Sequence, residues 1–138
     1  MAIHRWSQRS LKNLDVHPDL RRVADRALEL LAATDYDFTI TDGGRTKKEQ
    51  EEFVRTGKSK TMKSRHLGGF ALDYIALVWD ERLKRKVGTY EPSAMKIIAD
   101  AFKRAGRELG IPVEWGGDWK SFADMPHIQL RKKEYPDV

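Results

Sequence analysis

The sequence predicts a single α+β domain in which helices pack on a small and mostly antiparallel sheet. Two segments place apolar residues at helical spacing, and short strand-like segments lie between and after them. The chain has 138 residues, a length that one compact domain uses fully, so we expect residues 1–138 to form one domain. An apolar fraction of 40% and a charged fraction of 34% are typical of a globular protein rather than a disordered one.

Four helices are predicted from capping residues and from the spacing of apolar side chains. Pro18 suits the first turn of a helix, and Thr46 with Glu49 has the pattern of a capping box. Gly57 and Gly110 are suitable residues just beyond helix C-termini. The predicted helices span residues 7–14, 18–31, 46–54 and 92–109.

Short strands are predicted between and after these helices. The polar and basic run 80–86 predicts a turn that leads into a returning edge strand. The other predicted strands span residues 37–41, 70–79, 113–115 and 128–130. This order favours the α+β class over a parallel α/β fold.

The composition excludes several kinds of chemistry. The chain has no Cys, which excludes disulfides, thiolate catalysis and Cys-ligated zinc. A metal site would therefore use His, Asp or Glu side chains, and the histidines are His4, His17, His66 and His127. We interpret His4 and His17 as non-ligands, because the first lies near the terminus and the second precedes the proline of a helix start.

The sequence also bears on location and partners. The first residues lack the apolar core of a signal peptide, and the apolar stretches are too short to cross a bilayer, so we expect synthesis in the cytoplasm and no stable membrane insertion. A net charge of +5 suggests an anionic partner: nucleic acid, a membrane surface or a bacterial envelope. The alternative is an ordinary surface rich in Lys and Arg.

Asp73 lies inside an apolar strand segment, where Asp is uncommon. Strand alternation places it on one face and Leu72 and Tyr74 on the other. A carboxylate in the middle of a strand needs a partner, and His66 lies seven residues earlier, across a turn that contains Gly. The pair predicts either zinc ligands or a structural His–Asp hydrogen bond.

His127 is a candidate for a third ligand, because it opens a short strand near the end of the chain. Three protein ligands leave a fourth position for water, as catalytic zinc requires. Asp124 lies three residues earlier and is close enough in sequence to act as a general base toward that water. Its alternative role is that of a turn or capping residue.

These residues resemble the zinc D,D-carboxypeptidases of the VanX/VanY type, and more closely their L-alanyl-D-glutamate endopeptidase branch, which includes bacteriophage endolysins. The motif S-x-H-x-x-G-x-A-x-D is present as Ser64, His66, Gly69, Ala71 and Asp73. The resemblance covers nearly the whole chain. It includes residues 16–20, 43–46, 49–50, 57–60, 106–111 and 115–119.

The resemblance implies a zinc-peptidase fold of the hedgehog and D,D-peptidase type, with His66, Asp73 and His127 as ligands of Zn2+. Asp124 occupies the general-base position, and an Asp there favours the endopeptidase branch. Arg45 occupies the position of a substrate-facing arginine, which would polarise the scissile carbonyl and stabilise an oxyanion. Further substrate contacts are expected from Ser64, Gln50, Trp115 and Asp118.

Structural roles are the alternatives for several of these residues. Arg45 would form a surface salt bridge, and Gln50 would lie on a solvated helix face. Ser64 would cap a turn. Aromatic residues beside a strand, such as Trp115, Trp119 and Tyr74, are more often part of the core.

The function implied by the resemblance is that of a zinc-dependent endolysin, which hydrolyses the L-Ala–D-Glu bond of bacterial peptidoglycan. The expected setting is the periplasm of a Gram-negative host, with a monomeric enzyme that depends on a holin for access. One alternative is a D-Ala-D-Ala carboxypeptidase of the same family. A second is a metal site that serves structure only.

A third alternative is a basic nucleic-acid-binding module. It would use two basic clusters, which are Lys58, Lys60, Lys63 and Arg65 and then Arg82, Lys84, Arg85 and Lys86. No helix-turn-helix, zinc-finger or ribonucleoprotein signature accompanies them, so we do not expect nucleic acid as the partner.

Overall fold

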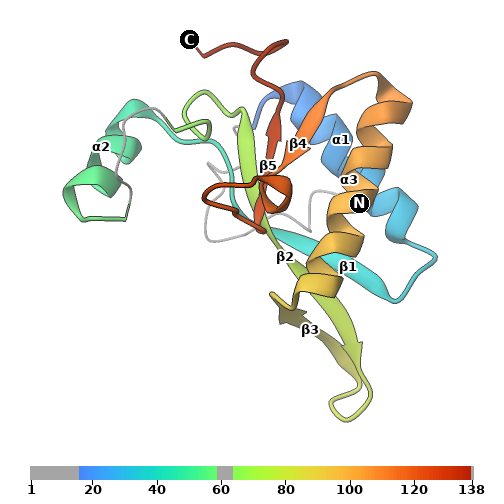
Figure 1. Ribbon diagram of the computed structural model, residues 1–138. Helices are drawn as coiled ribbons and strands as arrows, with labels where there is room; N and C mark the ends of the chain where they lie inside the picture. Colours follow the sequence, from blue (N-terminus) through green and yellow to red (C-terminus); the bar gives the residue numbers. More distant parts are fainter. Residues whose placement is uncertain (1–15, 59–63, 138) are drawn as a thin grey trace.

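The computed structural model describes residues 16–58 and 64–137, so the predicted helix over residues 7–14 and His4 lie outside the described residues. The described chain folds in the order α1 (Pro18–Leu31), β1 (Tyr36–Asp42), α2 (Lys47–Arg55), β2 (Ala71–Asp80), β3 (Arg85–Thr89), α3 (Pro92–Leu109), β4 (Val113–Trp115), the 3-10 helix η3 (Gly116–Asp118) and β5 (His127–Leu130) (Figure 1). The three predicted helices within the described residues and all five predicted strands are confirmed.

The sheet is antiparallel at every named strand pair, which confirms the predicted α+β class. The strand order is β1-β2-β5-β4, and β3 also pairs with β2. The long strand β2 pairs with β5 near its start and with β3 near its end. The register with β5 places Asp73 opposite His127, so the sheet brings together two candidate ligands that are far apart in the sequence.

The core lies between one face of the sheet and the helices α1 and α3, which pack against each other and against β1. Leu72, Tyr74 and Ala76 of β2 are fully buried in it. The hydroxyl of Tyr74 donates a hydrogen bond to the carbonyl of Met95 on α3 (2.8 Å). Because side chains alternate along a strand, Asp73 points to the opposite face of the sheet. The core and the candidate metal centre thus occupy different faces.

The helix ends follow the predicted capping. The Thr46 side chain accepts a hydrogen bond from the backbone of Glu49, and the Glu49 side chain accepts one from the Thr46 backbone, which completes the capping box of α2. Gly110 ends α3 in the left-handed conformation, with φ of +70°. Within the described ranges, no helix is long and apolar enough to span a membrane.

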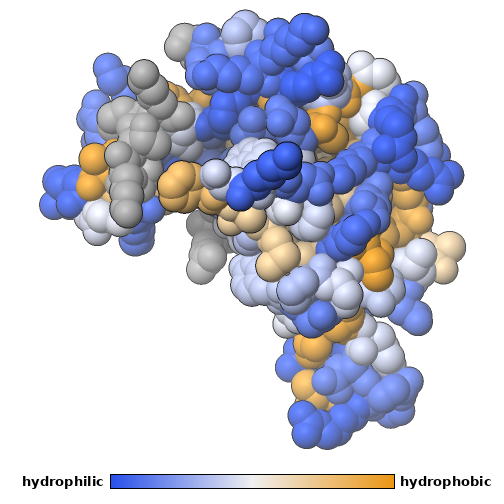
Figure 2. Space-filling model, in the orientation of Figure 1, coloured by the Kyte–Doolittle hydropathy of each residue, from blue (hydrophilic) through white to orange (hydrophobic). Residues whose placement is uncertain are grey.

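The β2–β3 hairpin extends away from the body of the molecule (Figure 1), and Figure 2 shows apolar side chains on it between hydrophilic ones. Trp79 and Leu83 are both 46% exposed there. The second basic cluster of the sequence lies on this hairpin. Of the first cluster, Lys60 and Lys63 lie outside the described residues, and Arg65 is engaged within the protein by Asp137 and the carbonyl of Leu130.

Candidate metal centre and active site

Three segments of the chain bring His66, Asp73 and His127 together. Asp73 comes from β2 and His127 from β5, in direct register. His66 comes from the loop before β2, where Gly69 adopts φ of +81° and its backbone N–H donates to the carbonyl of His66 (3.0 Å). The same carbonyl accepts from the backbone N–H of Arg45 (2.8 Å). The glycine turn folds His66 back toward the start of β2.

The geometry of these three side chains fits a metal ion. Asp73 Oδ1 lies 3.3 Å from His66 Nε2 and 3.4 Å from His127 Nδ1. One ligand atom from each residue lies within 4.8 Å of the others. Among the described residues, Oδ1 is buried and no hydrogen bond of suitable geometry reaches it. A cation bound between the three side chains would supply the missing partner.

Two acceptors fix the orientation of the imidazole rings. His66 Nδ1 lies 2.8 Å from the carbonyl of Gly43, and His127 Nε2 lies 2.8 Å from Oε1 of Gln129. Oxygen atoms of this kind only accept, so each of these nitrogens carries the hydrogen when the ring is neutral. The other nitrogen of each ring then offers its lone pair toward Asp73, as metal binding requires.

The charges of the site act on one another. Burial raises the pKa of Asp73, but the neighbouring His127 and His66 outweigh this effect and hold the pKa below its ordinary value. The pKa of Asp124 is raised, first by burial and then by the negative charge of Asp73. A carboxylate with a raised pKa is better suited to accept and return a proton than an ordinary surface Asp.

Asp124 lies beside the candidate ligands. Its Oδ2 is 3.9 Å from His127 Nδ1, and its side chain is 50% exposed. The backbone N–H of Asp124 donates to the carbonyl of Gly116 (2.9 Å), and its carbonyl accepts from the N–H of His127 (3.1 Å). The indole of Trp115 donates to the carbonyl of Met125 (2.7 Å). Hydrogen bonds at Asp124 itself and at the following residue therefore hold this loop in place.

Residues 1–135 match the family described as "Phage L-alanyl-D-glutamate peptidase". The chain belongs to this family. It is therefore an L-alanyl-D-glutamate peptidase that acts on peptidoglycan in the cell wall. This confirms the endopeptidase prediction and disfavours the carboxypeptidase and nucleic-acid-binding alternatives.

Individual relatives agree with this family. The L-alanyl-D-glutamate peptidase of Escherichia phage T5 is 34% identical over 123 residues, which cover 87% of this chain and 83% of that protein. The L-alanyl-D-glutamate peptidase of Listeria phage A118 is 35% identical over 94% of this chain, which spans 43% of that protein. The crystal structure of the Serratia marcescens L-Ala D-Glu endopeptidase ChiX is 43% identical, with a TM-score of 0.75 over 94% of this chain and 92% of that one.

Arg45 of the peptidase is the centre of a polar cluster next to the metal loop. Its guanidinium donates to Asp42 Oδ2 (2.5 Å), Gln50 Oε1 (3.0 Å) and Ser64 Oγ (3.5 Å). Ser64 Oγ also accepts from the backbone N–H of His66 (3.2 Å). The side chain of Arg45 is only 12% exposed, and its Nε is buried without a partner in the described part of the chain. Its fixed position suits a group that must bind developing negative charge.

The other residues that were predicted as substrate contacts differ in how deeply they are buried. Gln50 is fully buried rather than on a solvated helix face. Trp115 is 6% exposed and belongs to the core. Asp118 is exposed and forms an ion pair with Lys103 (2.5 Å). The ring of Trp119 lies 5.2 Å from that of His127 and so belongs to the surroundings of the metal centre.

Two site residues were missed by the sequence predictions. Gln129 orients His127, and Asp42 holds Arg45. A signal for Gln129 was available, because a polar residue two positions after a candidate ligand in a strand lies on the same face. His17 was predicted to start a helix, and it is indeed the N-cap of α1.

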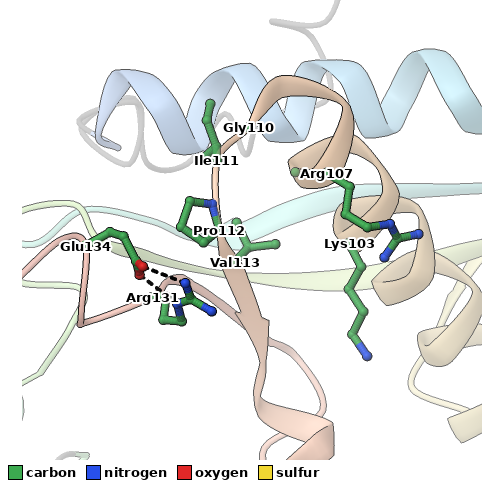
Figure 3. Close-up of a pocket in the computed structure, with 9 residues that line it drawn as sticks. Lys103, Arg107, Gly110, Ile111, Pro112, Val113, Arg131 and Glu134 are labelled. Atoms are coloured by element: carbon green, nitrogen blue, oxygen red, sulfur yellow. Dashed lines mark hydrogen bonds and ion pairs between the residues drawn. The ribbon is translucent and has the colours of Figure 1, made fainter.

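A basic groove of about 600 Å³ lies apart from this site, at the C-terminal end of α3 (Figure 3). None of the three candidate metal ligands lines it. Arg131 in this groove is paired with Glu134 through two short contacts. Lys103, which also lines the groove, is likewise paired with Asp118. Most of the positive charge of the groove is therefore already matched by carboxylates of the protein.

Proposed function

We propose that the peptidase is zinc-dependent, with His66, Asp73 and His127 as the ligands. The observation that supports this most strongly is the convergence of the three side chains on a buried Asp73 oxygen that lacks a hydrogen-bond partner in the described residues. Two imidazole nitrogens and one carboxylate oxygen form a donor set typical of catalytic zinc, with a fourth position open to water. Zinc bound there would supply Lewis-acid chemistry, which lowers the pKa of water and polarises a carbonyl.

The roles of the surrounding residues follow from their positions. Asp124 accepts a proton from the attacking water and delivers it to the amine of D-Glu as the peptide bond breaks. Arg45 stabilises the negative charge that develops on the carbonyl oxygen of L-Ala. Gln50 and Ser64 hold the guanidinium of Arg45 in place, and Ser64 presents a polar atom to substrate amides. Direct substrate contact by the fully buried Gln50 stays a prediction. Substrate contacts by Trp115 and Asp118 stay a prediction.

The biological setting is part of the same proposal. Residues 1–138 act as a single domain on the peptidoglycan of a Gram-negative host, in the periplasm, as a monomer that depends on a holin for access. The net charge of +5 supports attraction to an anionic envelope. Electrostatic attraction of this kind weakens as the salt concentration rises.

The metal assignment is tested by measuring the zinc content of the purified protein. We expect one zinc ion per chain in the unmodified enzyme. His127→Ala should lose the ion, because a site with two remaining ligands binds zinc much more weakly. Lys96→Ala on the exposed face of α3 is the control and should keep it. Unchanged zinc content in His127→Ala would remove His127 from the ligand set.

A further inference from the structure

Phe122 has two features that are unfavourable in the isolated molecule. Its side chain is 96% exposed, whereas the other large apolar side chains that are exposed among the described residues range from 36% to 52%. Its backbone is left-handed, with φ of +54°, a conformation that residues other than Gly rarely adopt. An aromatic ring gains free energy when it leaves water, so its exposure here is not explained by folding. Such strain is typical of functional sites.

The loop that carries Phe122 is closed and firmly attached. The carbonyl of Gly116 accepts hydrogen bonds from the backbone N–H of both Trp119 (3.2 Å) and Asp124 (2.9 Å). The indole of Trp115 and the backbone of Tyr74 bind the next two carbonyls, of Met125 (2.7 Å) and Pro126 (2.9 Å). The exposure of Phe122 therefore belongs to a defined loop and not to a loose chain end.

The same loop borders the metal centre. Phe122 lies two residues before Asp124, which limits the separation of their Cα atoms to about 7 Å. Asp124 and Trp119, on either side of Phe122 in the loop, both lie against His127. In Figure 1 the loop between η3 and β5 crosses the sheet in front of β2. Phe122 thus belongs to the loop that borders the candidate active site.

The substrate has an apolar surface close to the scissile bond. In peptidoglycan, the L-Ala residue is attached through a lactyl group to a sugar ring, so a pyranose lies about 7–10 Å from the scissile carbonyl at ~3.6 Å per extended residue. One face of a pyranose chair presents C–H groups. Such a face packs on an aromatic ring, which removes apolar surface of both partners from water.

We propose that Phe122 forms a glycan subsite and packs on the sugar ring that bears the peptide being cleaved. The inference rests on the proposed function, because it assumes that L-Ala–D-Glu hydrolysis occurs beside Asp124. The loop would then have two roles, because Asp124 takes part in the reaction and Phe122 binds the carbohydrate. Contact with the sugar explains why an apolar ring is kept exposed on a strained backbone.

The test compares two substrates that differ only in the sugar. One is a disaccharide tetrapeptide, and the other is the same tetrapeptide with an acetyl group on L-Ala in place of the sugar. Phe122→Ala should lower kcat/KM for the disaccharide substrate about tenfold, mainly through KM, and change the acetylated peptide less than twofold. Ile97→Ala, which truncates an exposed apolar residue on α3, is the control and should match the unmodified enzyme on both.

A second variant separates binding from folding. Phe122→Gly removes the ring and suits the left-handed backbone, so its melting temperature should equal or exceed that of the unmodified enzyme while it shows the same loss on the sugar substrate. Equal losses on both substrates, no loss on either, or a lower melting temperature of Phe122→Gly would overturn the glycan subsite. Failure of the unmodified enzyme to cleave either substrate would overturn the proposed function itself.

Discussion

At the scale of single residues, the candidate metal centre depends on how Asp73 and the two histidines are oriented by groups that would not touch a bound ion. Gly43 supplies a carbonyl to His66, and Gln129 supplies an amide oxygen to His127. Each acceptor selects the tautomer whose free nitrogen faces Asp73. Gln129 is therefore a positioning residue, and its effect should be visible in metal affinity.

Removing the acceptor of Gln129 should weaken zinc binding. Gln129→Leu replaces the amide with an apolar side chain of similar size and so frees the His127 ring to turn or change tautomer. We expect zinc affinity to fall about 10- to 100-fold, measured by competition with a chromophoric chelator. Lys96→Ala serves as the distant control. An affinity equal to that of the unmodified enzyme would show that Gln129 does not orient the ligand.

Asp124 should be required for turnover but not for zinc binding. Its carboxylate lies 3.9 Å from His127 Nδ1 and is half exposed, as a group that exchanges protons with water must be. In Asp124→Ala we expect full zinc content and a loss of about 10²- to 10⁴-fold in kcat, measured by release of peptides from peptidoglycan. A variant that retained most of its rate would show that another group is the base.

At the scale of elements, the junction of β4, η3 and β5 positions the loop that carries Asp124. A Cβ atom added at Gly116 would lie 2.2 Å from the carbonyl oxygen of Asp124 and 3.1 Å from Cβ of His127. Both neighbours are fixed by backbone hydrogen bonds or by the sheet. Only glycine allows η3 to approach the loop this closely.

Gly116→Ala should therefore displace the loop. We expect a loss of about 1–3 kcal/mol in the free energy of unfolding together with a severe loss of activity, measured by denaturant titration and by peptide release. Gly88→Ala on β3 is the matched control, since its added Cβ would meet the flexible end of Ile75 and, at ordinary contact distance, that of Leu77. If Gly116→Ala were as active and stable as Gly88→Ala, the close approach would have no functional role.

Most elements were predictable from local sequence, but their pairing was not. The helix α3 shows helical apolar spacing and ends at Gly110, and both features are encoded within the segment itself. The register of Asp73 with His127 joins strands that are far apart in the chain, and no local pattern specifies it. The gathering of Arg45, Gln50 and Ser64 is equally non-local.

The burial of some side chains could also not be predicted from the local sequence. Trp115 lies in a strand of three residues, which is too short for alternation to show which side chain faces inward. The structure buries it, and its indole supports the loop through Met125. Gln50 was predicted as a substrate contact, with a solvated helix face as the alternative, and the structure instead buries it against Arg45, a contact that the pattern of α2 does not encode.

In the whole molecule, the residues that stabilise the fold and those of the candidate active site lie on opposite faces of the sheet. The helices α1 and α3 and the core lie on one face of the sheet, and the candidate ligand Asp73 lies on the other. The candidate metal centre joins the loop before β2 with strands β2 and β5, and backbone hydrogen bonds hold these three segments in place. Substitutions at exposed site residues such as Asp124 should therefore leave the fold intact.

Mass spectrometry of digested peptidoglycan is the sharpest test of zinc-dependent hydrolysis at the L-Ala–D-Glu bond. We predict released peptides that begin with D-Glu, while L-Ala stays on the sugar. Release should stop after metal removal with a chelator and return when zinc is added. Loss of only a terminal D-Ala, or unchanged release in excess chelator after metal removal, would contradict the account.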